Sequence, residues 1–583
     1  MKHVFHAMLL MSAATLFAPA VAWAQEWAVE GGGGAHLPKP MRAPLSSDVL
    51  FSMRSPRPDG PGVAQEFRAN RIEWIYSNDA RLVTSLKIKG FLAGLTLNAN
   101  PAIGSDDGYA RDFDGRVVVA PWMKSWGAKW ANTNSPKTSA FIFNEARKLV
   151  AAGADSIQFD DPDLQYSPTK WADGDFSEAS LREFKRYLVA KNLTGRAAEA
   201  GFSVESGETY RDHLTVKHGI KTAAEYIARK KTLPLTPVWE SFLMSSVRDF
   251  HSSLKQMLRT ELGRYTPLSF NMHIEPDAKS LYLADIPDYA IAESQDFNLT
   301  DMGIRIATAR AIPVGYVASL IPRGLEETRA AIAAHYAAGA PVVAPWDMYM
   351  PDIKGVNQPR YYGAASDFAD IFQFVRENRS LFDNYEAMPV VMLTVPINQA
   401  DQAELRRVVG VMTRHGIPYA FALSGGMFKD FKLDESRLRA AKFVVRLGAT
   451  SDYREADLKA LASIKSVVAT STVTDEWARR NRPLTMAADE PSTAMLRART
   501  SPEATVTLHL IPRGKGDAKS VGPVNLSVSI ARWCLPRGAN RARIFALGQS
   551  TQVIDIRPGD DDVSITVPRA ALWSVVQFSR ESP

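Results

Sequence analysis

Cysteine is almost absent from this sequence, because Cys534 is the only one in 583 residues. A single thiol excludes an intramolecular disulfide, so packing alone has to stabilise the fold. Zinc motifs are missing too: there is no His-x-His, no His-Glu-x-x-His and no cysteine pair, and His213 and His218 do not share a helical face. We therefore expect no zinc centre and no bound cofactor.

Three other catalytic or nucleotide-binding motifs are absent. The sequence has no Gly-x-Ser-x-Gly elbow, no P-loop and no Gly-x-Gly-x-x-Gly turn. These absences argue against a serine esterase, a nucleotide phosphotransferase and a dinucleotide-binding fold, respectively. Catalysis by carboxylate side chains is the possibility that these absences leave.

Long apolar runs are confined to the N-terminus. Lys2 precedes an apolar stretch from Ala7 to Val21, and Ala22-Trp23-Ala24 offers the small-x-small pattern of a cleavage site. We expect residues 1–24 to be a signal peptide, residues 25–47 a flexible lead-in rich in Gly and Pro, and the protein to be periplasmic or secreted. No later stretch reaches the roughly 18 apolar residues of a membrane span, so no membrane anchor is expected.

Composition describes a folded protein of several domains, with 46% hydrophobic and 23% charged residues. The formal net charge of +6 is small for this length, and the basic residues are scattered. We therefore expect no nucleic-acid partner. The sequence makes no prediction of the oligomeric state.

Short apolar strands alternate with amphipathic helical segments over residues 48–386, as βα units of a parallel sheet require. Eight such units predict a (β/α)8 TIM-like barrel, and an open doubly wound sheet is the alternative. The candidate strands are Val49–Met53, Ile72–Tyr76, Leu92–Leu97, Val117–Trp122, Ser156–Phe159, Leu268–Met272, Tyr289–Ala292, Val314–Ser319 and Val342–Trp346.

Two further regions follow the barrel. Apolar strands and helices alternate over residues 387–490 and predict a small α/β domain. Over residues 500–583 the pattern changes to short alternating segments with polar turns, which predicts a C-terminal antiparallel β-sandwich.

Carboxylates follow several of the predicted barrel strands. Asp160 and Asp161 end a strand too apolar for the surface, Glu293 ends another, and Glu275 is a reserve candidate. Side chains at the carboxyl ends of barrel strands face the mouth, where barrel enzymes have their active sites. Alternation along the strand would send only one member of the Asp160–Asp161 pair inward. A helix cap, a salt-bridged loop, or a divalent-cation site that includes Asp163 are the alternatives.

Candidate substrate-binding residues lie in loops or at strand ends. An exposed Trp ring can stack on the apolar face of a sugar, and polar side chains can bind its hydroxyls. Packing beneath loops is the alternative for the aromatics. The candidates are Arg54, Asn98, Trp122, Trp126, Asn271, His273, Trp346 and Asp347.

The stretch Gly153–Pro162, with Gly174–Ser177 and Phe184–Leu188 after it, resembles the fourth-strand acid and following helix of β/α-barrel glycoside hydrolases. The order of barrel, small α/β domain and C-terminal β-domain is similar to family 42 β-galactosidases. That family has an Asn-Glu pair at the fourth strand, where this sequence has Asp160-Asp161. The resemblance thus implies a glycosidase of a distinct barrel family.

The function we predict is an exported glycoside hydrolase that cleaves an oligo- or polysaccharide. Two carboxyl groups would flank the scissile bond, pairing Asp160 or Asp161 with Glu293. The alternative is a non-catalytic polysaccharide-binding or scaffold protein on a β/α-barrel. Convergence of these acids at one place would favour the enzyme.

Overall fold

The computed structural model describes residues 43–54, 56, 58–294, 298–320, 324–344, 364–388, 390–465, 467–486, 498–500, 505–511, 524–556, 561–570 and 572–580. The predicted signal peptide, most of the lead-in, Trp346 and Asp347 lie outside these residues.

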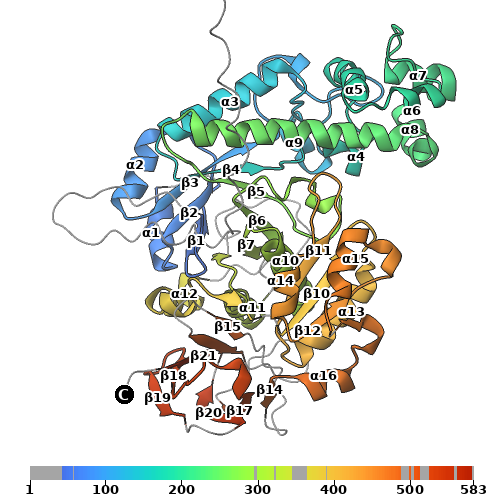
Figure 1. Ribbon diagram of the computed structural model, residues 1–583. Helices are drawn as coiled ribbons and strands as arrows, with labels where there is room; N and C mark the ends of the chain where they lie inside the picture. The colour runs from blue at the N-terminus through green and yellow to red at the C-terminus, as the bar shows by residue number, and fades with distance from the viewer. Residues whose placement is uncertain are drawn as a thin grey trace, which may run out of the picture. The chain divides into compact units, whose positions relative to one another are not determined.

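Eight parallel strands close into a barrel in chain order, which confirms the predicted fold class (Figure 1). Each strand pairs with its neighbours in sequence, and β1 pairs with β8 to complete the circle. The strands are β1 (Val49–Ser52), β2 (Arg71–Ile75), β3 (Leu92–Asn98), β4 (Ser156–Asp160), β5 (Leu268–Asn271), β6 (Tyr289–Ser294), β7 (Gly315–Leu320) and β8 (Val342–Val343).

One predicted barrel strand is wrong. Residues 117–122 lie between β3 and the next long helix, where Val117 and Val119 make only isolated antiparallel bridges and Pro121–Trp126 is a 3₁₀ turn. The sequence pattern predicted a strand here because Val118 and Ala120 are buried at alternate positions, as residues of a strand are. Pro121 lacks a backbone N–H and ends the extended segment.

Helices connect the strands around the barrel. In the predicted example, Pro136 opens α3 and Gly153, at φ 103°, lets the chain leave it for β4. The helices are α1 (Gly60–Glu66), α2 (Ala80–Ile88), α3 (Pro136–Ala151), α4 (Pro168–Trp171), α5 (Glu178–Ala190), α6 (Thr194–Glu199), α7 (Tyr210–His218), α8 (Ala223–Arg229), α9 (Thr236–Thr260), α10 (Leu299–Ala311), α11 (Leu325–Ala337) and α12 (Ala369–Glu377).

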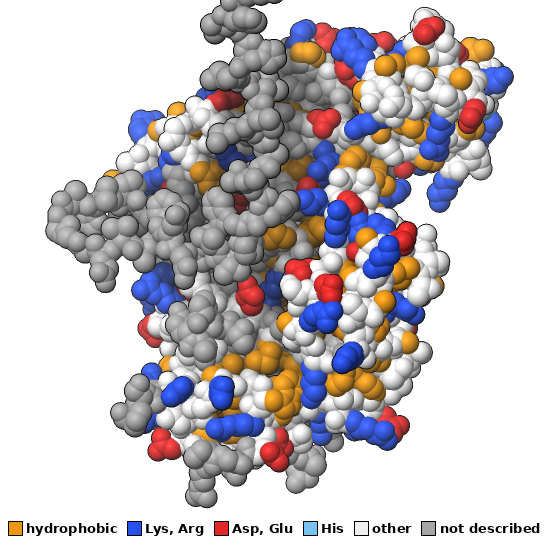
Figure 2. Space-filling view, in the orientation of Figure 1, with side chains coloured by type: hydrophobic (Ala, Val, Ile, Leu, Met, Phe, Trp, Pro, Cys, Tyr) orange, Lys and Arg blue, Asp and Glu red, His pale blue; other side chains and the backbone are white. Residues whose placement is uncertain are grey.

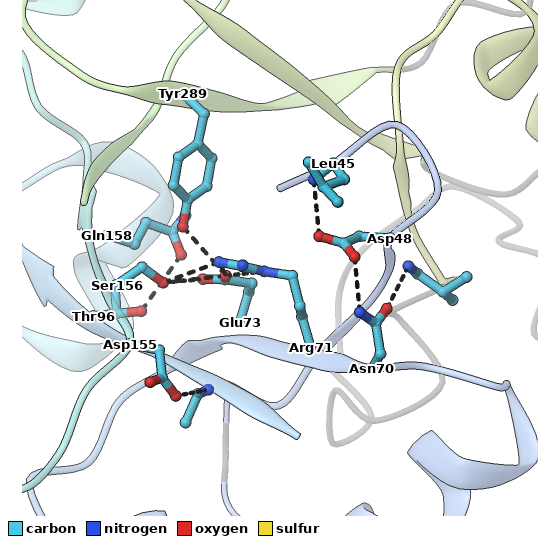
Figure 3. Close-up of polar contacts among 12 residues, drawn as sticks. Leu45, Asp48, Asn70, Arg71, Glu73, Thr96, Asp155, Ser156, Gln158 and Tyr289 are labelled. Atoms are coloured by element: carbon cyan, nitrogen blue, oxygen red, sulfur yellow. Dashed lines mark hydrogen bonds and ion pairs between the residues drawn. The ribbon is translucent and has the colours of Figure 1, made fainter. Parts of the chain in front are cut away.

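A buried ion pair occupies the barrel interior below the strand ends (Figure 3). Arg71 donates to Glu73 Oε1 from Nη2 at 2.7 Å, and Ser156 and Tyr289 donate to the same oxygen at 3.2 Å. Gly94 makes room for the pair, since a Cβ there would lie 1.7 Å from Glu73 Oε2. The hydrogen bonds are what makes a buried charge pair tolerable here.

The second region is a four-stranded parallel sheet in the order β11-β10-β12-β13 with helices against it. Its strands and helices are β10 (Val391–Pro396), α13 (Gln402–Arg414), β11 (Tyr419–Ser424), α14 (Glu435–Ala440), β12 (Phe443–Arg446), α15 (Glu455–Ala462), β13 (Val467–Ala469) and α16 (Asp475–Asn481). These elements agree with the predicted α/β layer.

The C-terminal region has two antiparallel sheets, of strand order β14-β17-β20 and β19-β18-β21-β16-β15-β9. Two of these strands, β9 (Glu386–Ala387) and β14 (Leu484–Met486), come from chain segments that precede the predicted sandwich. The others are β15 (Ala498–Thr500), β16 (Val506–Leu510), β17 (Val524–Ala531), β18 (Arg541–Ala546), β19 (Gln552–Asp555), β20 (Asp562–Ala570) and β21 (Ser574–Ser579).

Cys534 is buried in the core of the C-terminal region, and burial raises the pKa of its thiol to about 12.

Among the described residues, no helix has the length and apolar character that crossing a membrane requires. Lys and Arg side chains are interspersed with Asp and Glu on the face seen in Figure 2, in keeping with the scattered basic residues of the sequence.

Candidate active site

Asp160 is the member of the predicted pair that points into the barrel. It ends β4, is only 7% exposed, and accepts hydrogen bonds at both carboxylate oxygens. Asn271 Nδ2 donates to Oδ1 at 2.7 Å, and the Tyr76 hydroxyl and Trp74 Nε1 donate to Oδ2. These hydrogen bonds hold the carboxylate in one orientation.

Tyr76 and Trp74 were not predicted as site residues. A register irregularity in β2 between Ile72 and Ile75 leaves Trp74 at φ 63° and turns its ring into the barrel. Simple alternation along the strand therefore gives no sign of this arrangement. Tyr76 ends the predicted strand Ile72–Tyr76, so the strand-end criterion applied to the acids would have found it.

Asp161 adopts a left-handed backbone conformation, at φ 54°. This conformation breaks the alternation of the strand and is one that Asp tolerates better than most residues. Burial raises the pKa of the Asp161 carboxyl to about 8, with further contributions from the charges of Asp160, Glu293 and Asp163. The group is thus protonated at neutral pH and able to donate a proton.

The loop after Asp161, residues 161–164, is clamped from several sides. His251 lies against the carbonyl of Pro162 with its Nε2 at 2.7 Å, and Trp130 Nε1 donates to the carbonyl of Leu164 at 2.6 Å. Burial lowers the pKa of His251 to about 4, so its ring is neutral at pH 7. Leu164 is itself left-handed, at φ 43°. These contacts hold a backbone conformation that would otherwise be unfavourable.

Asp163 in the same loop is fully engaged with neighbouring side chains. The Tyr282 hydroxyl donates to Oδ1 at 2.6 Å, and Lys170 Nζ donates to Oδ2 at 2.5 Å. The ammonium group already balances this carboxylate, which speaks against the divalent-cation alternative. Among the described residues, no cluster of His, Cys, Asp or Glu is arranged to hold a metal ion.

Glu293 is the last residue but one of β6, at the same end of the barrel. Its Oε1 accepts from Arg54 Nη2 at 2.7 Å, and the Arg54 guanidinium lies 3.9 Å from the centre of the Trp74 ring. The Glu293 side chain is 33% exposed, so a substrate can reach it. Its charge contributes to the raised pKa of Asp161, and the Trp74 ring next to Arg54 donates to Asp160, so Glu293 belongs to the same cluster of side chains as Asp160.

The other predicted residues divide into those at the site and those elsewhere. Asn271 contacts Asp160 directly, and Asn98 lies beside Asp160 in the register of β3 and β4. His273 is exposed in the loop after β5. Glu275, the reserve acid, is held in an ion pair with Arg305, whose Nε lies 2.6 Å from its Oε1.

The predicted tryptophan platforms lie on the 3₁₀ turn Pro121–Trp126. Trp122 and Trp126 are 55% and 67% exposed. Trp122 packs edge-to-face with Trp130 at 6.1 Å and Trp171 at 5.5 Å. Because Trp130 binds the loop after Asp161, this aromatic cluster flanks the candidate acid.

No protein-family model matches this sequence, and no curated protein matches it. Several solved structures, in contrast, are similar to the structure of this chain. Alpha-L-fucosidase isoenzyme 2 from Paenibacillus thiaminolyticus has a TM-score of 0.58 at 10% identity, covering 92% of this chain and 99% of that one. A beta-galactosidase from the psychrophilic Marinomonas ef1 has a TM-score of 0.52 at 12% identity, covering 92% and 100%. The resemblance to β/α-barrel glycoside hydrolases is therefore confirmed at the level of the fold.

Proposed function

We propose that this chain is a glycoside hydrolase that cleaves an oligo- or polysaccharide, with Asp161 as the general acid and Glu293 as the second carboxylate. The observation that carries the proposal is the convergence of Asp160, Asp161 and Glu293 at the carboxyl ends of β4 and β6. That end of a β/α-barrel is where barrel enzymes place their reactive groups.

Glycosidic cleavage requires one carboxyl group that gives a proton to the leaving oxygen and one that is ionised. Asp161 meets the first requirement, since its raised pKa keeps it protonated at neutral pH. Glu293 is our candidate for the second, since it forms an ion pair with Arg54 while its side chain stays one-third exposed. The two residues therefore have the different environments that acid and nucleophile or base need.

Asp160 has a supporting role in this proposal. Its two oxygens are occupied by Tyr76, Trp74 and Asn271, and it is almost fully buried. A fixed negative charge next to Asp161 favours the protonated form of that group. Asp160 thus maintains the proton that Asp161 donates.

Export belongs to the same proposal, because a periplasmic or secreted enzyme meets polysaccharides outside the cytoplasm. Lys2, the apolar stretch Ala7–Val21 and the site at Ala22–Ala24 support cleavage before Gln25. N-terminal sequencing of protein recovered outside the cytoplasm tests this, and an intact Met1 in that fraction would contradict it.

The experiment uses 4-nitrophenyl glycosides as probes, beginning with the α-L-fucoside and β-D-galactoside because two structural neighbours bear those activities in their names. Glu293→Gln should lower kcat on these probes by at least about 100-fold, and Asp161→Asn should do so on an oligosaccharide with the same terminal sugar, because a sugar leaving group needs the proton that 4-nitrophenolate does not. Wild-type activity should also fall as the pH rises through about 8, where Asp161 loses its proton.

Glu275→Gln is the matched control, because Glu275 is also a carboxylate that follows a barrel strand but is held in an ion pair with Arg305. It should retain turnover. Near-wild-type turnover in Asp161→Asn and Glu293→Gln would refute the assignment. Sugar binding without turnover of any glycoside would favour the non-catalytic alternative.

A further inference from the structure

The loop after β11, residues 425–431, is a rigid projection of the α/β domain. Gly425 and Phe431 exchange backbone hydrogen bonds at its base, at 2.8 and 3.0 Å. Gly426 has φ 132°, and a Cβ there would lie 2.1 Å from the carbonyl oxygen of Lys429. Arg454 binds both Asp430 and the carbonyl of Phe431. We call this segment the β11 loop.

The tip of the β11 loop contacts the barrel. The Phe428 ring lies 6.4 Å from the Tyr282 ring, and the Arg248 guanidinium lies 5.4 Å from the Phe428 ring centre. Met427, next to Phe428, is 43% exposed. In Figure 1 the orange loop extends from β11 toward the elements at the mouth of the barrel, which agrees with these contacts.

Tyr282 connects the β11 loop to the clamped loop that carries Asp161. Its hydroxyl donates to Asp163 at 2.6 Å, and its ring packs edge-to-face with Tyr166 at 5.3 Å. Asp163 is two residues from Asp161 and is close enough for its charge to act on it. A continuous line of contacts therefore joins Phe428 to the residues around the acid.

Hydrogen bonds to backbone carbonyls hold the α/β domain against the segment between β5 and β6. The Ala278 N–H donates to the carbonyl of Ile397 at 3.1 Å, and Gln402 Nε2 donates to the carbonyl of Pro276 at 3.4 Å. These contacts join the α/β domain to the same segment that carries Tyr282, the residue that Phe428 of the β11 loop contacts.

We infer that Met427 and Phe428 form the wall that receives the sugar on the leaving-group side of the scissile bond. This rests on the proposed function, in which Asp161 protonates the leaving oxygen, so that residues on the side of Asp161 face the leaving group. An exposed thioether and an aromatic ring can pack on the apolar face of a sugar. The loop would thus select oligosaccharides over substrates with small leaving groups.

The test compares two kinds of substrate with the full-length protein. Met427→Ala and Phe428→Ala are assayed with a 4-nitrophenyl glycoside that the wild type cleaves and with a trisaccharide that has the same terminal sugar. We expect kcat/KM for the trisaccharide to fall in both variants, by about tenfold in Phe428→Ala, as the loss of one ring contact predicts, with less than about a twofold change for the aryl glycoside. Phe428→Leu should restore part of the loss.

Val216→Ala is the control, since Val216 is an apolar residue that is 80% exposed on α7 and far in sequence from the site. Equal losses on both substrates, or a shift of the basic limb of the pH profile, would overturn the inference by showing that Phe428 only supports Asp163. Unchanged kinetics on both would overturn it too.

A failure of the proposed function is distinguishable from a failure of this inference. If the wild type cleaves no glycoside, the proposed function fails, and calorimetric titration of a trisaccharide that ends in β-D-galactose, the sugar of one of the probes, then tests the loop alone. Weaker binding in Met427→Ala and Phe428→Ala than in Val216→Ala would support the wall. Equal binding in all of them would reject it.

Discussion

At the scale of single residues, the backbone of Asp161 matters as much as its carboxyl group. The left-handed φ of 54° is accessible to Asn and Asp at small cost and unfavourable for most other side chains. Asn is therefore the replacement that removes the charge and preserves the loop. An Ala at this position would remove the carboxyl group and also strain the backbone, so a lower activity would not report on the carboxyl group alone.

The titration of Asp161 predicts how stability changes with pH. Its folded pKa of about 8 lies above the value of about 3.9 for an unfolded Asp, so the folded state binds more protons between these values. The contribution of Asp161 to the free energy of unfolding is complete below about pH 4 and is lost as the pH rises through about 8. Asp161→Asn should therefore melt near the wild type at pH 4 and be more stable by at least about 1 kcal/mol at pH 8.

Thermal unfolding at a series of pH values measures this difference. Asp106→Asn is the control, since Asp106 is an exposed carboxylate paired with Lys129. A difference between Asp161→Asn and the wild type that stays constant from pH 4 to pH 8 would show that Asp161 is ionised throughout.

At the scale of secondary-structure elements, β3 has to carry a glycine at position 94, because a side chain there would meet Glu73. The carboxylate of Glu73 fills the space that a Cβ on Gly94 would need, and Ser156 Oγ would lie only 2.8 Å from that Cβ. Gly94→Ala should displace Glu73 from Arg71 and lower the free energy of unfolding by about 3 kcal/mol or more, because it both overpacks the interior and disturbs a buried ion pair.

Chemical denaturation of Gly94→Ala and Gly62→Ala provides the comparison. A Cβ on Gly62 would meet nothing within 4 Å, and Gly62 lies in α1, where Ala is the better helix former. Gly62→Ala should be neutral or stabilising. Equal stability of the two variants would mean that the barrel interior accommodates the extra methyl group.

The strands of the barrel were predictable because each combines an apolar run with a turn or a glycine that ends the preceding helix. Residues 117–122 show the limit of that reasoning, since burial at alternate positions also occurs in a loop that packs on the barrel. The acids were predictable from their place after strands. The participation of Trp74 and the conformation of Asp161 were not predictable, because both residues adopt a left-handed backbone conformation that no sequence pattern indicates.

At the scale of the whole molecule, the C-terminal region contributes a buried side chain, Trp573, to the hydrophobic core of the barrel region. Trp573 is fully buried and packs against Tyr336, Phe374 and Phe382, with ring centres 5.3 to 6.4 Å away. Truncation before Ala504 removes β16, the partner of β15, and β17, the partner of β14. The truncated protein should therefore expose apolar surface and lose solubility.

Soluble yield and melting temperature after truncation measure this effect, and Trp573→Ala in the full chain tests it without removing strands. Trp573→Ala should lose about 3–5 kcal/mol of stability, as large-to-small changes of buried Trp do. Trp533→Ala is the control, because Trp533 is 49% exposed. A soluble truncated protein that melts like the full chain would show that the C-terminal region is an independent module.

The buried thiol of Cys534 makes this chain well suited to site-specific labelling. With a pKa of about 12 the sulfur is not a thiolate at neutral pH, and burial keeps reagents away from it. Since it is the only native cysteine, a cysteine introduced at an exposed position such as Met427 would be the single reactive group. A fluorophore attached there would report on sugar occupancy next to the β11 loop without any change to the rest of the sequence.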